Sequence, residues 1–266
     1  MTESNELKGV GAEEYDLNKL AFPYYDDFQR AIADLVVQHD LQLDKRSKII
    51  DLGVGTGDTS KAVLQHEGLT KLVNLTCVDF DPVLIKQAKR KLLPYQNRAN
   101  HVNFICKRAE EYFPTLKENS VDVIFSALTL HNHPPGTRKR IYQEASRVLN
   151  EEGILVLGDK FASRIPRDHL NEMTRMIMGY LHLLEIGRRD VFEYWIRHNL
   201  RDDQPDLQMT RSCRTTSEIM NSGFYGGAWF ETGDGDPNPW GMDQILVAYK
   251  SQKGFWKVRR GMGEKK

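Results

Sequence analysis

The sequence predicts an α/β fold: a mostly parallel sheet of seven strands with an antiparallel last strand and helices on both faces. Between residues 48 and 160, short apolar runs alternate with amphipathic helical patterns, and such alternation is typical of parallel sheets with right-handed crossovers. The first apolar run stops at a glycine-rich turn, residues 53–57. Two later apolar runs, 224–232 and 244–250, predict a hairpin at the sheet edge that supplies strands six and seven.

Length and composition fit one main domain. The chain has 266 residues, and its 37 basic and 37 acidic residues cancel, so no overall charge attracts nucleic acid or acidic membranes. The three cysteines lack C-x-x-C spacing, which favours a reducing compartment and no zinc site. Two of them, Cys77 and Cys106, fall inside predicted core strands. The sequence predicts a cytoplasmic protein without a membrane partner, disfavours nucleic acid and leaves a homodimer open.

The chain divides into three parts. Residues 1–20 predict a flexible leader, 21–250 the main domain and 251–266 a basic tail. Within the main domain, an amphipathic helix begins near Phe22 and places Phe28 and Ile32 on its apolar face. At about 161–215, two helices interrupt the strand–helix alternation and predict a lid between strands five and six.

The glycine-rich turn predicts close approach to a ligand. Gly53, Gly55 and Gly57 follow a buried strand and precede a helix that runs to about His66. Glycine permits positive φ, and the N–H groups that open the helix favour a polar or anionic ligand group. The G-x-G-x-G spacing differs from the G-x-G-x-x-G of dinucleotide enzymes.

The second strand, 73–80, ends in an acid, Asp79. An acid at this place, about twenty residues beyond the glycine loop, can accept hydrogen bonds from both ribose hydroxyls. Its alternative role as a helix cap is better filled by Asp81, because Pro82 then occupies the first helical position. The basic residues of the following helix, at 86–91, are typical of a solvated face.

Strands three to five are predicted at 101–106, 121–125 and 153–157, with a helix at 138–149 between the last two. Thr215 to Glu218 resembles a helix start before strand six. The loop between strands six and seven should emerge at the ligand-binding edge of the sheet, because strand six should run parallel to the others.

This order of motifs resembles class I S-adenosylmethionine (SAM)-dependent methyltransferases, which have a Rossmann-like fold. The acid Asp51 before the glycine loop matches their E/D-x-G-x-G-x-G motif. The resemblance covers roughly residues 20–250 and implies SAM as cofactor, with S-adenosylhomocysteine as product. Where the family has Asp-Ala or Asn-Ala for the adenine, this chain has Arg108-Ala109, and arginine offers no acceptor. Backbone groups and guanidinium stacking would have to serve there. The cofactor-binding residues that the resemblance implies are Tyr25, Asp51, Gly53, Gly55, Thr56, Gly57, Asp79, Phe80, Arg108, Ala109 and Ser126.

The resemblance places methyl transfer beyond strand four, where His131 is the best-placed general base. A packing role for this histidine stays open. Asp159, at the end of strand five, is a second candidate base or acceptor-binding group, with anchoring of its loop as the alternative. The spacing of His131 and His133 also suggests a metal pair, but no third ligand has suitable spacing.

The methyl acceptor is expected to be a small molecule. Lid residues Tyr180, Arg189 and Trp195 and loop residues Asp236 and Trp240 are the candidate contacts. An acid beside an indole suits an amine or another cationic acceptor.

Three alternatives remain open from the sequence. The part after strand five is similar to the carboxy-SAM synthase branch, an enzyme class of tRNA modification, and an arginine of the lid, 188 or 189, would then hold the added carboxylate. A SAM-binding protein without catalysis would share the same motifs. A dehydrogenase would need the longer glycine spacing.

Overall fold

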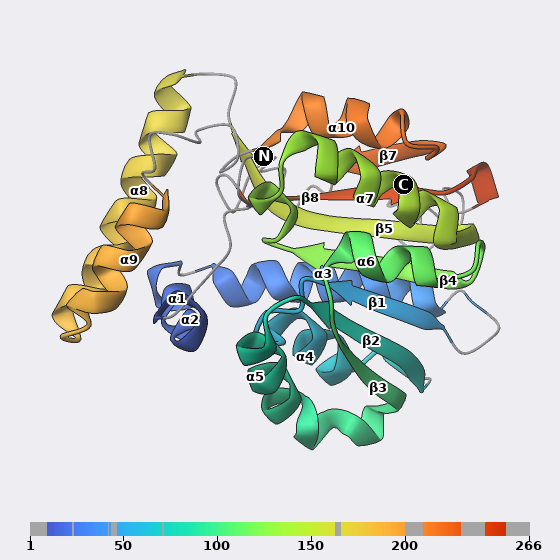
Figure 1. Cartoon of the computed structure of the whole chain (residues 1–266), viewed down its shortest axis with the longest axis horizontal. Helices are drawn as coiled ribbons and strands as arrows, with labels where there is room; N and C mark the ends of the chain where they lie inside the picture. Colours follow the sequence, from blue (N-terminus) through green and yellow to red (C-terminus); the bar gives the residue numbers. More distant parts are fainter. Residues whose placement is uncertain are drawn as a thin grey trace, which may run out of the picture.

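The computed structural model describes residues 10–22, 24–41, 43, 47–70, 72–162, 166–199, 210–229 and 243–253. Its strands form one sheet in the order β3-β2-β1-β4-β5-β8-β7, with β6 paired to β5 beside this path (Figure 1). The strands are β1 Lys48–Leu52, β2 Val73–Asp79, β3 Ala99–Cys106, β4 Val121–Ala127, β5 Leu149–Ala162, β6 Thr210–Arg211, β7 Gly226–Trp229 and β8 Asp243–Tyr249.

The direction of the strands confirms the predicted mostly parallel sheet. Strands β1 to β5 pair in parallel, whereas β8 runs antiparallel to both β5 and β7. Strand β7, the predicted strand six, therefore runs in the same direction as β5, as expected. The chain order reverses between β1 and β4, which are neighbours, and such a reversal opens a crevice at the carboxyl ends of the strands.

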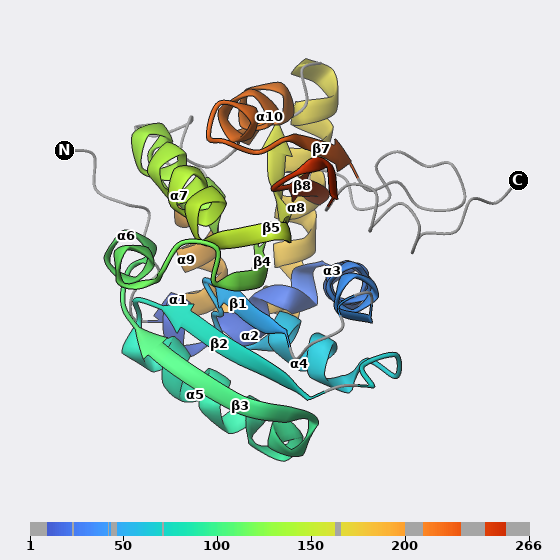
Figure 2. The ribbon, with the colours of Figure 1, turned by 90° about the vertical axis from the view of Figure 1, so that its right-hand side faces the viewer.

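Helices cover both faces of this sheet (Figure 2). One core cluster joins the sheet to α3, α4 and α5, and a second joins its other face to α6, α7 and α10. The α-helices are α1 Val10–Glu13, α2 Tyr15–Asn18, α3 Tyr25–Leu41, α4 Asp58–Gln65, α5 Pro82–Leu92, α6 Ala109–Tyr112, α7 Pro135–Val148, α8 Pro166–Glu185, α9 Arg189–Asn199 and α10 Ser212–Met220. The 3₁₀ helices are η1 Lys19–Ala21, η2 Leu93–Arg98, η3 Phe113–Thr115 and η4 Leu130–Asn132.

Several local predictions are confirmed. The predicted apolar face of α3 is buried, with Phe28 at 1% and Ile32 at 0% exposure. Asp81 caps α5, because its Oδ1 accepts a hydrogen bond of 2.7 Å from the backbone N–H of Val83, and Pro82 opens the helix. Because Asp81 caps the helix, the alternative role of Asp79 as a helix cap is excluded.

Other local predictions need correction. Strand β5 is longer than the predicted 153–157, and its end pairs with β6, which the sequence analysis missed. Helix α10 begins at Ser212 rather than at Thr215. Cys106 is exposed rather than in the core, because it ends β3, the outermost strand on that side of the sheet.

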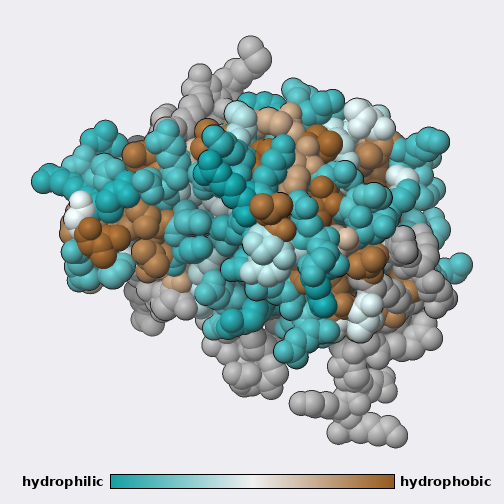
Figure 3. Space-filling view, turned by 90° about the horizontal axis from the view of Figure 1, so that it is seen from below, coloured by the Kyte–Doolittle hydropathy of each residue, from teal (hydrophilic) through white to brown (hydrophobic). Residues whose placement is uncertain are grey.

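Two helices, α8 and α9, lie where the sequence predicted a lid, and they stand beside the sheet at the left in Figure 1. The buried face of α8 carries Met176, Tyr180 and Leu183, because α8 packs against α9 and the N-terminal helices. Leu181 and Leu184 of the same helix are 36% and 40% exposed. Figure 3 shows hydrophobic side chains exposed at this end of the molecule.

The described part of the predicted leader is helical. Residues 10–21 form α1, α2 and η1, and their side chains join the core of α8 and α9. Residues 10–20, which the sequence placed in a flexible leader, thus adopt helices, and Ala12 and Ala21 are buried at 2% and 5% exposure. No helix in the described part of the chain has the length and apolar character to cross a membrane.

Candidate functional site

A pocket opens at the carboxyl ends of β1, β2 and β4, where the strand order reverses. It encloses about 990 Å³, counting the part open to solvent. Of the predicted cofactor-binding residues, those on its wall are Tyr25, Gly53, Gly55, Thr56, Asp79, Phe80, Arg108 and Ala109.

The glycine loop has the backbone that its spacing predicts. Gly53 and Gly55 have φ of 76° and 54°, a region that other residues rarely adopt. A Cβ on Gly53 would meet the side chain of Thr129 at 2.3 Å, whereas a Cβ on Gly55 would meet nothing within 4 Å. The open space at Gly55 lies on the pocket wall, so the loop presents bare backbone to a ligand.

Asp79 projects into the same pocket and is 7% exposed. Its Oδ2 accepts a hydrogen bond of 2.9 Å from Gly55 N–H, and its Oδ1 accepts one of 3.0 Å from Asp81 N–H. Burial raises the pKa of Asp79 above its usual value, although these backbone donors act in the opposite direction. A carboxylate has about four acceptor positions, so these backbone donors leave capacity for a ligand's hydroxyl group.

Three predicted cofactor residues support the loop from behind instead of lining the pocket. Asp51 is 1% exposed and accepts a hydrogen bond of 2.6 Å from Ser60 Oγ, and burial raises its pKa to about 7. Ser126 donates a hydrogen bond of 2.8 Å to the backbone oxygen of Leu52. Gly57 precedes α4 with φ of 92° and packs against Ala88.

Phe80, Arg108 and Ala109 also lie on the pocket wall. The guanidinium of Arg108 lies over the Phe80 ring, with its central carbon 4.8 Å from the ring centre. The sequence predicted an arginine that stacks on a flat ligand ring. In this structure, the guanidinium of Arg108 stacks on the ring of Phe80, which also lies on the pocket wall.

Tyr25 lies on the wall at the start of α3, with its hydroxyl 3.4 Å from Asp58 Oδ2. Burial, the main cause, and nearby carboxylates raise the pKa of Tyr25 well above its usual value, so the phenol stays protonated and can donate. Its place at the pocket agrees with the predicted position of an aromatic side chain near the cofactor.

His131 and Asp159 form a buried pair beside the pocket. His131 Nδ1 lies 2.5 Å from Asp159 Oδ1, and the backbone N–H of His131 donates to Asp159 Oδ2 at 3.0 Å. Asp159 also accepts a hydrogen bond of 2.9 Å from Lys160 N–H and is 0% exposed. Asp159 therefore orients the imidazole and anchors the loop, because its oxygens are directed at these three donors rather than at the pocket.

The next residues of this loop reach the pocket directly. Asn132 and His133 lie on its wall, whereas His131 does not. Burial lowers the pKa of His133, which keeps its imidazole neutral near pH 7. The carbonyl oxygen of His133 accepts a hydrogen bond of 2.6 Å from Arg138, which fixes the loop to α7. From the sequence, His133 was a candidate only as a metal ligand together with His131. In the described part of the chain, no three His, Cys, Asp or Glu side chains gather as a metal site.

The lid residues predicted to contact substrate lie away from the pocket. Tyr180 and Trp195 are 0% and 4% exposed and stack on each other with ring centres 6.2 Å apart. Arg189 is exposed and pairs with Glu193 at 2.9 Å. Aromatic residues at helical spacing form the core between α8 and α9 here, so the substrate role of these three is not supported by their position. Asp236 and Trp240 lie outside the described residues.

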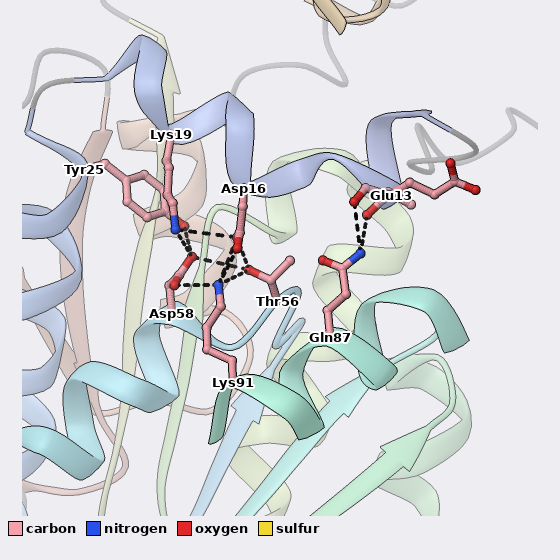
Figure 4. A network of polar contacts seen from close by, with 9 residues as sticks. Glu13, Asp16, Lys19, Tyr25, Thr56, Asp58, Gln87 and Lys91 are labelled. Atoms are coloured by element: carbon pink, nitrogen blue, oxygen red, sulfur yellow. Dashed lines mark hydrogen bonds and ion pairs between the residues drawn. The ribbon is translucent and has the colours of Figure 1, made fainter. Parts of the chain in front are cut away.

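Sequence reasoning missed a polar network at the third side of the pocket (Figure 4). Lys91 of α5, Asp16 of α2, and Thr56 and Asp58 of the glycine loop and α4 meet there. Thr56 and Asp58 had a sequence signal, because Thr56 lies within the glycine loop and Asp58 follows it directly. Lys91 and Asp16 had none, because they come from segments far from the loop and from each other in the chain.

Comparisons with known proteins agree with this geometry. Residues 50–157 match the methyltransferase domain family. Among curated proteins, none matches the sequence. The CurJ carbon methyltransferase is a structural neighbour with a TM-score of 0.65 and 15% identity, and the match covers 91% of this chain and 61% of that one. The chain thus spans less than two thirds of that structure's length.

Two further solved structures share the fold. A SAM-dependent methyltransferase of Thermotoga maritima, a possible histamine N-methyltransferase, has a TM-score of 0.51 and 16% identity over 90% of this chain and 95% of that one. The CMeT domain of the citrinin polyketide synthase has a TM-score of 0.54 and 18% identity over 78% of this chain and 47% of that one. Residues 50–157 are therefore similar to a methyltransferase domain, and the chain has the Rossmann-like fold of these neighbours. The cofactor that this similarity implies is S-adenosylmethionine.

Proposed function

We propose that this protein transfers a methyl group from SAM to a small-molecule acceptor, with His131 as the general base. One observation carries the proposal: the buried pair of His131 and Asp159 lies at the carboxyl ends of β4 and β5, beside the pocket. The wall of this pocket includes the glycine loop and Asp79, the acid that we expect to bind a ribose. Bound SAM supplies an electrophilic methyl group on its sulfonium. The chain's own residues have to hold, orient and desolvate the reactants and remove a proton where the acceptor carries one.

The residues on the pocket wall fit this cofactor. Asp79 keeps acceptor positions for ribose hydroxyls, and the bare backbone at Gly55 admits a ligand at close range. Phe80, Arg108 and Ala109 offer a flat, partly apolar end that suits adenine, without a side-chain acceptor for its amino group. Asp51, Gly57 and Ser126 do not line the pocket, and their role is to hold the glycine loop in its conformation.

The roles of His131 and Asp159 follow from their contacts. Since Nδ1 of His131 faces Asp159, its Nε2 is the nitrogen that can take a proton. Asp159 then stabilises the imidazolium that forms, as a carboxylate does when it orients a basic histidine. We therefore assign Asp159 the role of positioning residue and not that of a second base.

We keep the prediction that Asp236 and Trp240, in the stretch of sequence between β7 and β8, help to select a cationic or amine acceptor. A carboxylated SAM finds less support, because Arg188 pairs with Asp190 and Glu14, and Arg189 pairs with Glu193. Both guanidinium groups are thus engaged in ion pairs within the chain.

The test is methyl transfer from radiolabelled SAM to small molecules of a cell extract. In the wild-type protein, we expect a labelled product. His131→Asn should lower turnover by about a hundredfold or more while the affinity for S-adenosylhomocysteine stays nearly unchanged. His101→Asn is the matched control, because His101 is exposed on β3, away from the pocket.

A third variant separates the two histidines of the loop. If His133→Asn loses turnover and His131→Asn does not, the base is His133 and our assignment is wrong. Binding of S-adenosylhomocysteine without transfer to any acceptor would instead indicate a SAM-binding protein without catalysis.

A further inference from the structure

Lys91 makes contacts that its place in a basic helix does not predict. Its Nζ lies 2.8 Å from Asp58 Oδ1, 2.9 Å from Thr56 Oγ1 and 2.9 Å and 3.0 Å from the two oxygens of Asp16. The side chain is only 18% exposed, and that of Asp58 is 14% exposed. Thr56 and Asp58 belong to the pocket wall, so the ammonium group of Lys91 holds that wall from outside (Figure 4).

Asp16 brings a distant segment to the same point. It lies in α2, within residues 10–22, which we call the N-terminal segment. Asp16 Oδ1 also accepts a hydrogen bond of 2.7 Å from Thr56 Oγ1. Partial burial acts to raise the pKa of Asp16, but the bonds from Lys91 and Thr56 outweigh it and lower this pKa. The carboxylate is therefore charged at neutral pH and paired with Lys91.

Two more contacts fasten the N-terminal segment to α5 and to the pocket. Gln87 Nε2 donates to the backbone oxygens of Ala12 and Glu13, at 3.0 Å and 3.2 Å. Tyr15 lies on the pocket wall itself. The segment thus closes the side of the pocket where Tyr25, Thr56 and Asp58 lie.

The other side of the N-terminal segment packs against α8 and α9. Glu14 pairs with Arg188 at 3.2 Å. A Cβ on Gly11 would meet the ring of Tyr194 at 2.1 Å, and one on Gly179 would meet the backbone oxygen of Ala21 at 2.2 Å. Both glycines therefore mark places where the segment and the lid helices are in direct contact.

We propose that Lys91 is a positioning residue for the cofactor: it fixes Asp58 and Thr56 on the pocket wall and, through Asp16, fastens the N-terminal segment over the pocket. Because the same segment contacts α8 and α9, cofactor occupancy and the position of the lid helices are coupled. This inference rests on the cofactor of the proposed function and adds residues that no motif of the sequence assigns.

Lys91 has this role rather than Lys19, the other cation of the network. Lys19 lies 3.6 Å from both Asp16 and Asp58 and is 32% exposed, so solvent screens its pairs. Lys91 has shorter contacts and less exposure. Its removal leaves Asp58 and Thr56 without their common partner, at a site where water can replace it only in part.

The experiment measures binding of S-adenosylhomocysteine by calorimetry in low salt, which needs no turnover. We expect Lys91→Met to raise Kd by about tenfold, a change of the size of one well-shielded charge contact. Lys91→Arg should recover part of the affinity, and Asp16→Asn should weaken binding in the same direction. Lys86→Met is the matched control, because Lys86 is exposed on the same helix, and its Kd should stay within about twofold of the wild type.

A second measurement tests the coupling in the wild-type protein. Hydrogen exchange of backbone amides in residues 10–22 and in α9 should slow when S-adenosylhomocysteine binds, and this effect should shrink in Lys91→Met and in Arg188→Gln. Unchanged Kd in folded Lys91→Met, or unchanged exchange of residues 10–22 in the wild type, overturns the proposal. Binding with these effects but without methyl transfer would refute the proposed function and leave this inference intact.

Discussion

The guanidinium of Arg108 lies over the ring of Phe80, 4.8 Å from its centre, on the pocket wall where adenine is expected. The two residues are therefore one unit of the wall. We expect their contributions to cofactor affinity to be coupled: in a double-mutant cycle of Arg108→Ala and Phe80→Ala, the interaction free energy should be about 0.5–1 kcal/mol.

Calorimetry with S-adenosylhomocysteine measures this coupling. Lys107→Ala is a suitable control, because Lys107 also lines the pocket and precedes Arg108. If the changes in binding free energy of the two substitutions add strictly, Arg108 and Phe80 contribute to ligand binding independently and the predicted coupling is absent.

Asp79 holds the glycine loop and lies on the pocket wall, where we expect it to bind the ribose. Asp79→Ala should weaken SAM binding by about 1–3 kcal/mol, because ribose hydroxyls lose their acceptor. Since Gly55 N–H also donates to Asp79, this variant should lose folding stability as well. Asp79→Asn keeps one acceptor oxygen, so its affinity for SAM should lie between those of the wild type and Asp79→Ala. Equal SAM affinity in the wild type and Asp79→Ala would reject the ribose assignment.

Asp51 makes stability depend on pH. Burial raises its pKa in the folded chain to about 7, above its ordinary value of 3.8, so the folded state keeps the proton at pH values where the unfolded state has lost it. The contribution of Asp51 to the free energy of unfolding therefore falls as pH rises between these two values. From pH 4.5 to 8, we expect a loss of about 3 kcal/mol.

Urea unfolding of the wild type and Asp51→Asn at both pH values measures this loss. Asparagine keeps an acceptor for Ser60 and does not titrate. The free energy of unfolding of Asp51→Asn should therefore increase relative to that of the wild type as pH rises. A constant difference between the two proteins would mean that Asp51 titrates normally in the folded state.

Gly179 permits the contact between α8 and the N-terminal helices. Gly179→Ala places a methyl group 2.2 Å from the backbone oxygen of Ala21, so α8 and η1 must separate. We expect a loss of stability of about 1–3 kcal/mol in thermal or urea unfolding. Gly136→Ala is the control, because a Cβ there meets nothing within 4 Å. If Gly179→Ala matches this control, α8 does not pack on η1 as described.

The sequence by itself determined the features that depend on neighbours in the chain. The positive φ of Gly53 and Gly55 follows from their glycines, and the cap of α5 follows from Asp81 and Pro82. Asp79 reached the pocket as predicted, because the carboxyl ends of neighbouring parallel strands share one edge of the sheet.

Only the tertiary structure decided which side chains of distant segments meet. Lys91 and Asp16 are 75 positions apart, and a row of lysines in a helix resembles a solvated face until another segment packs on it. The same reason explains α8: its periodicity predicts a helix, but its packing partners select Met176, Tyr180 and Leu183 as the buried face. His131 and Asp159, 28 positions apart, meet because β4 and β5 pair in parallel, and the roles that we propose for them rest on this contact, which their positions in the sequence did not predict.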